Sequence, residues 1–88
     1  MFKASYFFPG IISYDLDIIS ILRDWRDSEG SLQQLYRELR YRNKRTKITK
    51  KILQKRLDLL VKNKIVFKRE YRFADTHYCL VEYFNYNS

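Results

Sequence analysis

The sequence predicts an α+β fold in which three helices precede a two-stranded β-hairpin. Apolar residues recur with the period of a helix up to about position 63, and beyond position 65 the pattern changes to the two-residue alternation of a strand. A chain of 88 residues with 45% hydrophobic residues fits one small domain, 1–88. We divide it into an aromatic N-terminal arm (1–12), three helices (13–63) and a hairpin (65–84).

The first helix is expected to begin at Ser13. Four apolar residues recur after it at the spacing that lines one face of a helix: Ile18, Ile21, Leu22 and Trp25. The polar run that includes Gly30 then breaks the pattern and ends the helix.

The second helix is expected to follow Ser31 and to run to about Tyr41. Ser31 and Gln34 form the pattern of a capping box, in which each side chain bonds to the backbone N–H of the other residue. Residues 42–45 then interrupt the apolar stripe and are expected to form a strongly basic turn.

The third helix is expected to begin after Thr49, whose hydroxyl can accept a bond from a free backbone N–H, with Thr46 as the alternative cap. Its buried stripe would consist of leucines at positions 53, 57 and 60. The helix should end near Asn63, because asparagine tolerates the left-handed conformation of a C-terminal cap.

The hairpin is predicted from two runs with β-strand alternation. Phe67, Arg69, Tyr71 and Phe73 alternate with charged residues, and a second run extends from Tyr78 to Tyr83. The short polar segment 74–76 between the runs is typical of a hairpin turn.

Basic residues are concentrated in one part of the chain. Residues 37–72 carry fifteen Lys or Arg and three acids, a local net charge of +12, whereas the remainder carries −4. Such segregation indicates a basic face for a polyanion. The alternative is a charged surface that serves only solvation.

In this order of elements, and above all in residues 48–66, the chain resembles the winged helix-turn-helix family. That stretch contains a helix with leucines three apart, a helix end, and two apolar residues that enter the hairpin. Many members have glycine where Lys64 stands. Small archaeal and archaeal-virus regulators are similar in size and aromatic content. The resemblance implies a sequence-specific, double-stranded DNA-binding transcription regulator whose recognition helix, about 49–62, enters the major groove.

The candidate DNA-binding residues fall into three groups. The turn is assigned to phosphates, the start of the third helix to base edges, and the hairpin to the backbone or minor groove. Gln54 is the foremost candidate for base readout, because glutamine pairs with adenine; the alternative is a solvated helix residue. In the hairpin the alternative is that the charges are solvated. The groups are Arg42, Lys44, Arg45 and Lys47; Thr49, Lys50, Lys51, Gln54 and Lys55; and Lys68, Arg69 and Arg72.

Aromatic residues near both termini suggest a homodimer, whose paired recognition helices would fit two half-sites. The same residues are equally able to form one cluster within a monomer. They are Phe2, Phe7, Phe8, Tyr83, Phe84 and Tyr86.

Other classes of function are disfavoured. One histidine, His77, and one cysteine, Cys79, offer neither a catalytic set nor metal-ligand spacing, so we expect no enzyme, metal, cofactor or small-molecule ligand. The sequence shows no signal peptide, membrane span or paired cysteine, so we expect a cytoplasmic protein, which would act in the host cell if it is viral. An intermolecular disulfide through the single cysteine is the alternative to a free thiol. The alternatives to a regulator are a protein-interaction module and a non-specific architectural nucleic-acid-binding protein.

Overall fold

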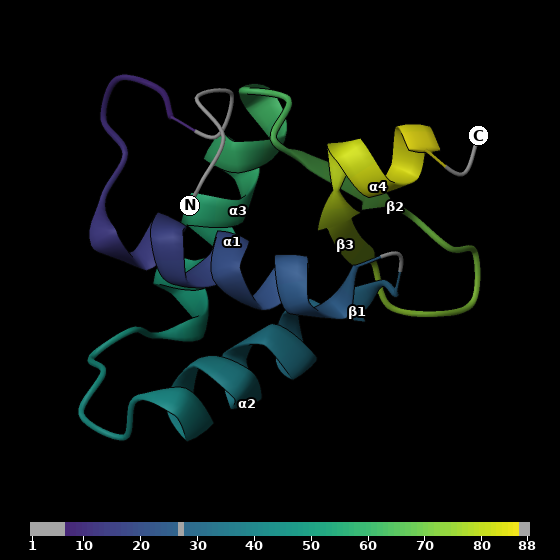
Figure 1. The fold of residues 1–88 in the computed structure, drawn as a ribbon. Coiled ribbons are helices and arrows are strands. Elements are labelled where there is room, and N and C mark those ends of the chain that lie inside the picture. The colour runs from purple at the N-terminus through teal and green to yellow at the C-terminus, as the bar shows by residue number, and fades with distance from the viewer. Residues whose placement is uncertain (1–6, 27, 87–88) are drawn as a thin grey trace.

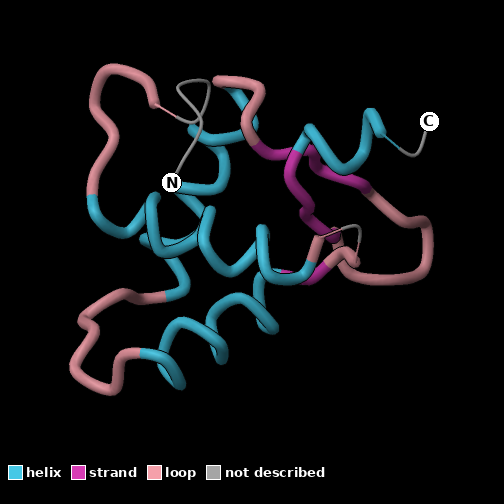
Figure 2. Tube along the Cα trace, in the orientation of Figure 1, coloured by secondary structure: helices cyan, strands magenta, loops and turns pink. Residues whose placement is uncertain are grey.

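The computed structural model describes residues 7–26 and 28–86, and over these it is an α+β domain with four helices and one three-stranded antiparallel sheet. Three helices lie together and the sheet lies at one end of them, as Figures 1 and 2 show. The elements are α1 (Ser13–Trp25), β1 (Gly30–Ser31), α2 (Leu32–Arg42), α3 (Lys50–Lys62), β2 (Val66–Arg69), β3 (His77–Leu80) and α4 (Val81–Tyr86).

The predicted N-terminal caps of α2 and α3 are confirmed. Ser31 Oγ accepts from the backbone N–H of Gln34 at 3.3 Å, and Gln34 Oε1 accepts from the N–H of Ser31 at 2.8 Å. Thr49 Oγ1 accepts from the N–H of Ile52 at 3.1 Å, so Thr49 and not Thr46 caps α3. Each cap satisfies a backbone donor that the helix itself leaves without a partner.

The C-terminal end of α3 is confirmed at Asn63, but the left-handed residue is Lys64. Asn63 has a φ of −88°, and its side chain Nδ2 donates to the carbonyl of Leu59 at 2.8 Å. Lys64 has a φ of 61° and turns the chain into β2. A lysine in this conformation is strained, because its Cβ crowds the following carbonyl oxygen.

We therefore expect Lys64→Gly to raise the free energy of unfolding by about 0.5–1 kcal/mol, because relief of the strain exceeds the extra entropy of glycine in the unfolded chain. Lys62→Gly is the matched control. It lies in the last turn of α3, where glycine should cost up to about 1 kcal/mol. Urea unfolding of both variants measures the difference, and equal destabilisation of both would contradict the prediction.

Strand β1 lies between α1 and α2 and was not predicted. In the sheet order β1-β3-β2, Gly30 pairs with Tyr78 and Ser31 with His77. The ring of Trp25 occupies the space that a side chain at position 30 would need, so any larger residue there would have to displace that ring. Through β1 the helices are hydrogen-bonded directly to the hairpin.

The hairpin strands are shorter than predicted, and the 65–84 boundary was wrong at its C-terminal end. β3 stops at Leu80, opposite Val66, and Val81 donates its N–H to Ile65 at 3.0 Å before α4 begins. Beyond that point β2 offers no further partner, since the chain before Ile65 belongs to the end of α3. β2 ends at Arg69, so the connection extends over residues 70–76 and is not confined to 74–76.

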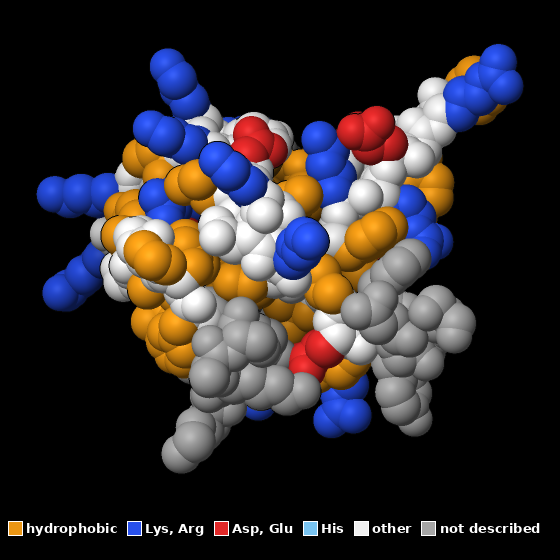
Figure 3. All heavy atoms as spheres, turned by 90° about the horizontal axis from the view of Figure 1, so that it is seen from above, with side chains coloured by type: hydrophobic (Ala, Val, Ile, Leu, Met, Phe, Trp, Pro, Cys, Tyr) orange, Lys and Arg blue, Asp and Glu red, His pale blue; other side chains and the backbone are white. Residues whose placement is uncertain are grey.

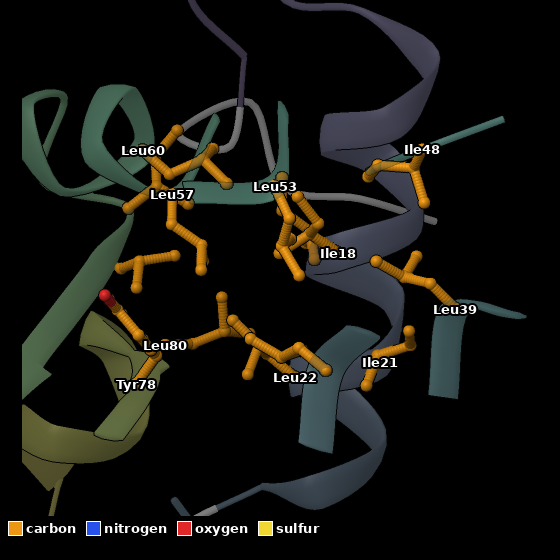
Figure 4. Close-up of a cluster of buried hydrophobic side chains, with 14 residues drawn as sticks. Ile18, Ile21, Leu22, Leu39, Ile48, Leu53, Leu57, Leu60, Tyr78 and Leu80 are labelled. Atoms are coloured by element: carbon orange, nitrogen blue, oxygen red, sulfur yellow. The ribbon is translucent and has the colours of Figure 1, made fainter. Parts of the chain in front are cut away.

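The hydrophobic core lies between the three long helices and the inner face of the sheet (Figure 4). Leu53, Leu57 and Leu60 of α3 are fully buried, as predicted. They pack with Ile18, Ile21 and Leu22 of α1, Leu35 and Leu39 of α2, and Val66, Tyr78 and Leu80 of the hairpin. This packing fixes which face of α3 remains on the surface.

A buried ion pair joins α1 to α3. Asp15 is fully buried, and its carboxylate accepts from Arg56 Nε at 2.8 Å and from Arg56 Nη2 at 2.6 Å. The same carboxylate accepts from the backbone N–H of Ile12 at 2.9 Å, and Arg56 also donates to the carbonyl of Gly10 at 3.1 Å. The hydrogen bonds to Asp15 raise the pKa of Arg56 above its ordinary value. Arg56 is therefore a structural residue, although it lies in the basic segment.

Candidate nucleic-acid interface

The two faces of α3 differ in chemistry. One face contributes buried leucines to the core, and Lys51 and Lys55 are exposed on the other. Lys50 is exposed in the first turn of the helix, where its Nζ lies over the ring of Tyr36 of α2. All three lysines lie in the N-terminal half of the helix. Helix α3 thus offers cationic side chains where recognition helices contact nucleic acid.

The turn between α2 and α3 holds three more exposed cations next to this face. Ile48 is buried in the core, and Asn43 Oδ1 accepts from the backbone N–H of Arg45 at 3.1 Å. These contacts fix a turn in which Lys44, Arg45 and Lys47 are exposed. At seven residues, 43–49, the turn is longer than the three or four residues or so typical of a helix-turn-helix.

None of these six cations has an acidic partner among the residues that the structure describes. Lys50 lies over an aromatic ring, and the five without a ring contact are Lys44, Arg45, Lys47, Lys51 and Lys55. Several Lys and Arg side chains project together from one edge of the molecule in Figure 3. Because no carboxylate neutralises these five charges, they are available to the phosphates of a nucleic acid.

The structure adds two α2 residues that sequence reasoning missed. The ring of Tyr36 has the guanidinium carbon of Arg40 at 5.6 Å and Lys50 Nζ at 5.5 Å from its centroid, within the range of cation–π contacts. Arg40 also donates to the hydroxyl of Tyr36 at 3.4 Å. Arg40 is exposed and four residues from Tyr36, so the helical spacing was a usable signal.

Arg42, which was assigned to phosphates, is held by two carboxylates instead. Its Nη2 lies 2.8 Å from Asp24 Oδ2 of α1, and its Nε lies 3.5 Å from Glu38 Oε1 of α2. This arrangement neutralises the charge and ties the end of α2 to α1. Arg42 is thus a poorer phosphate ligand than the cations of the turn.

Gln54 is half-buried, and its amide is engaged within the protein. Its Nε2 donates to Asp58 Oδ1 at 3.0 Å and to the hydroxyl of Tyr78 at 3.2 Å. Bidentate pairing with adenine uses this NH₂ group together with Oε1. Base readout by Gln54 therefore requires that the amide give up one of these bonds.

A groove of about 610 Å³ separates α3 from the hairpin. Lys50 and Gln54 lie on the α3 side, Lys68 and Asp75 on the hairpin side, and Tyr78 between them. Its remaining lining residues are Ser31, Leu32, Gln33, Asp58 and Thr76. The polar face of α3 and the hairpin loop are therefore neighbours on one side of the molecule.

The predicted hairpin cations have contacts of their own. Lys68 Nζ lies 3.3 Å from Glu70 Oε1, whose hydrogen bond and charge raise the pKa of Lys68. Arg69 Nε lies 3.3 Å from Glu29 Oε2. Glu29 also accepts from the hydroxyl of Tyr71 at 2.7 Å, and this bond raises the pKa of Tyr71. Of the three predicted cations, only Arg72 has no carboxylate partner among the described residues.

The terminal aromatic residues are divided between the core and the surface. Phe8 and Tyr83 pack against the core, whereas Phe7 is half exposed. Phe2 lies outside the described residues, as do the side chains of Phe84 and Tyr86. Part of the predicted dimer surface is therefore used within the monomer.

Cys79 and His77, which are two residues apart on β3, have different surroundings. Cys79 is buried, and this burial raises the pKa of its thiol, which disfavours the reactive thiolate. The ring of His77 forms an edge-to-face contact with the ring of Tyr71, with the ring centroids 5.1 Å apart. Within residues 7–26 and 28–86, no cluster of His, Cys, Asp or Glu is arranged to bind a metal, and no helix has the length and apolarity to cross a membrane.

Comparison of the chain with protein-family models, curated proteins and solved structures gives no significant match.

Proposed function

We propose that this chain is a winged helix-turn-helix protein that binds double-stranded DNA sequence-specifically as a transcription regulator. α3 enters the major groove, the turn 43–49 contacts phosphates, and the β2–β3 hairpin is the wing. The observation that carries the proposal is the set of exposed cations on the turn and on the N-terminal half of α3, a helix that buries its leucines in the core.

The dimensions of α3 support insertion into DNA. A helix is about 10–12 Å wide with its side chains, and the major groove is about 12 Å wide. The 13 residues of α3 are capped at Thr49, and the first turns of the helix carry the exposed lysines. Side chains near the start of a recognition helix are the ones that usually meet base edges.

The order of elements is compatible with a winged helix. Three helices precede the hairpin, and β1 joins the hairpin to the helices along the edge of β3. α4 and the long turn are additions to the minimal arrangement of three helices and a two-stranded wing. Neither covers the polar face of α3, because Lys50, Lys51 and Lys55 remain exposed.

We also propose that two copies bind two half-sites through their paired α3 helices. The exposed fractions of Phe7 (50%) and Ile12 (42%) support an apolar contact near the N-terminal side of α1. Sedimentation equilibrium is expected to give twice the chain mass, and a single monomeric species at working concentration would contradict the dimer.

Alanine variants, measured on cognate and scrambled duplexes, test whether the turn contacts phosphates and Gln54 reads a base. Lys44→Ala and Arg45→Ala should each weaken both duplexes alike and reduce the slope of log K against log salt by about 0.9, because each removes one phosphate contact. Gln54→Ala should weaken mainly the cognate duplex, by about 5- to 150-fold, the range of one base contact.

Tyr78→Phe is the matched control for Gln54→Ala. It removes the hydroxyl that Gln54 contacts but retains the buried ring. If Tyr78→Phe reproduced the loss of Gln54→Ala, Gln54 would act by supporting the fold. Equal losses on cognate and scrambled DNA for all three alanine variants would refute the assigned roles.

A further inference from the structure

The loop between β2 and β3 ends in an aromatic side chain that the fold leaves uncovered. The last strand pair is Arg69 with His77, and residues 70–76 project beyond it at the right of Figure 1. Phe73 is 92% exposed, the highest value among the large hydrophobic residues that the structure describes. The same projection is seen from above in Figure 3, where it ends in basic and hydrophobic side chains.

A cation accompanies this ring. The guanidinium carbon of Arg72 lies 5.4 Å from the centroid of Phe73. An apolar ring with a guanidinium beside it suits a partner that offers flat apolar surface and negative charge within a few ångströms. Stacked bases flanked by phosphates meet that description, whereas a purely apolar protein pocket would leave the guanidinium without a partner.

The position of the loop agrees with a nucleic-acid partner. Lys50 and Gln54 of α3 and Asp75 of the loop line the same groove, so the loop stands beside the polar face of α3. One helical turn of DNA is roughly 34 Å long, and along it the minor groove lies about half a turn from the major groove. The domain measures 37 × 34 × 21 Å, which is enough for α3 and the loop tip to face adjacent grooves.

We propose that Phe73 is a wedge that inserts between two base pairs from the minor groove and kinks the duplex, with Arg72 on the neighbouring phosphates. The inference rests on the proposed function and adds to it an intercalating residue and a bent DNA product. Apolar wedges of this kind unstack one base step and bend DNA by about 20–90°. Pyrimidine–purine steps such as TA are the easiest to unstack, so the preferred site should carry one under the wing.

The experiment uses a duplex selected for binding, with 2-aminopurine placed in turn at each candidate step and a donor and an acceptor dye at its ends. Wild-type protein should increase 2-aminopurine fluorescence at one step and shorten the distance between the dyes. Phe73→Ala should lose both signals and bind about tenfold more weakly, the cost of truncating an aromatic anchor. Phe73→Leu should retain most of the bend, because leucine also serves as a wedge.

Tyr41→Ala is the matched control, since Tyr41 is 77% exposed but lies on α2. It should leave both signals unchanged. A Phe73→Ala variant that still bends and unstacks the duplex would overturn the wedge. Tight duplex binding by wild type without bending would also overturn the wedge, but it would leave the proposed function intact. Absence of duplex binding by wild type at low salt would remove the proposed function itself. Binding to anionic lipid vesicles that depends on Phe73, with unchanged DNA bending, would assign the loop to a membrane surface and overturn the wedge.

Discussion

Asp15→Ala is expected to lower the free energy of unfolding by about 3–5 kcal/mol, the cost of removing one partner of a buried ion pair. The variant leaves Arg56, whose side chain is only 13% exposed, without its carboxylate. It also removes the acceptor of the Ile12 N–H at the start of α1. The total free energy of unfolding of a small domain is about 5–15 kcal/mol, so the midpoint of urea or thermal unfolding should shift strongly.

Asp24→Ala is the matched control, because the Asp24–Arg42 pair has a comparable distance of 2.8 Å but exposed fractions of 61% and 37%. An exposed pair of this kind contributes at most about 1 kcal/mol. The double variant Asp15→Ala/Arg56→Met should be less destabilised than the sum of its single variants, since it leaves no buried charge. Similar losses for Asp15→Ala and Asp24→Ala would show that the buried pair does not hold α1 to α3.

The simultaneous change of Lys50, Lys51 and Lys55 to alanine is expected to reduce duplex affinity on the order of 10²–10³-fold at low salt, since three cationic contacts of α3 with the duplex are lost. Alanine favours helices at least as well as lysine, so α3 should form as before. Fluorescence anisotropy measures the affinity, and circular dichroism confirms that helix content is retained.

Lys62→Ala is the control within the same helix. Lys62 is exposed at the opposite end of α3, away from the turn 43–49, and its removal should change the affinity little. If Lys62→Ala lost one third as much binding free energy as the triple variant, affinity would follow the number of charges removed. Net charge, and not the α3 face, would then govern binding.

The elements that the sequence predicted best are those fixed by nearby residues. The bounds of α2 and α3 follow from Ser31, Gln34 and Thr49, each of which bonds to the backbone three residues away. The buried stripe of α3 follows from helical spacing. Local rules suffice in these cases because both partners lie within one turn of a helix.

Contacts between distant residues account for what the sequence did not predict. Nothing near Arg56 indicates that Asp15, 41 positions away, neutralises it. β1 exists only because β3 lies beside Gly30 and Ser31, and those residues otherwise resemble a break and a helix cap. In each case the partner is supplied by the tertiary fold.

The end of the hairpin was misjudged for a related reason. The alternation of residues 78–83 continues past Leu80, but a strand also needs a partner, and β2 offers none beyond Val66. Before β3, the alternation at Tyr71 and Phe73 has no role in strand pairing, since Tyr71 contacts Glu29 and Phe73 is exposed. Alternation alone therefore overestimated both strands.

The candidate site was predicted in its centre and less well at its margins. The exposed lysines of α3 and the cations of the turn are where the sequence placed them. At the margins, Arg42 and Arg69 are held by carboxylates from α1 and from the segment before β1. Charge counted along the chain does not reveal such neutralisation, because the acids come from the other part of the sequence.

The central claim, that the cationic face of α3 docks on duplex DNA, is tested most directly by fluorescence anisotropy of the wild-type protein on duplex and single-stranded DNA across a salt series. We expect a preference for duplex, a slope of log K against log salt of about −0.9 per phosphate contacted, and binding to a selected site at least about 10³-fold tighter than to random duplex. Failure to bind duplex at low salt, or a preference for single strands, would contradict it.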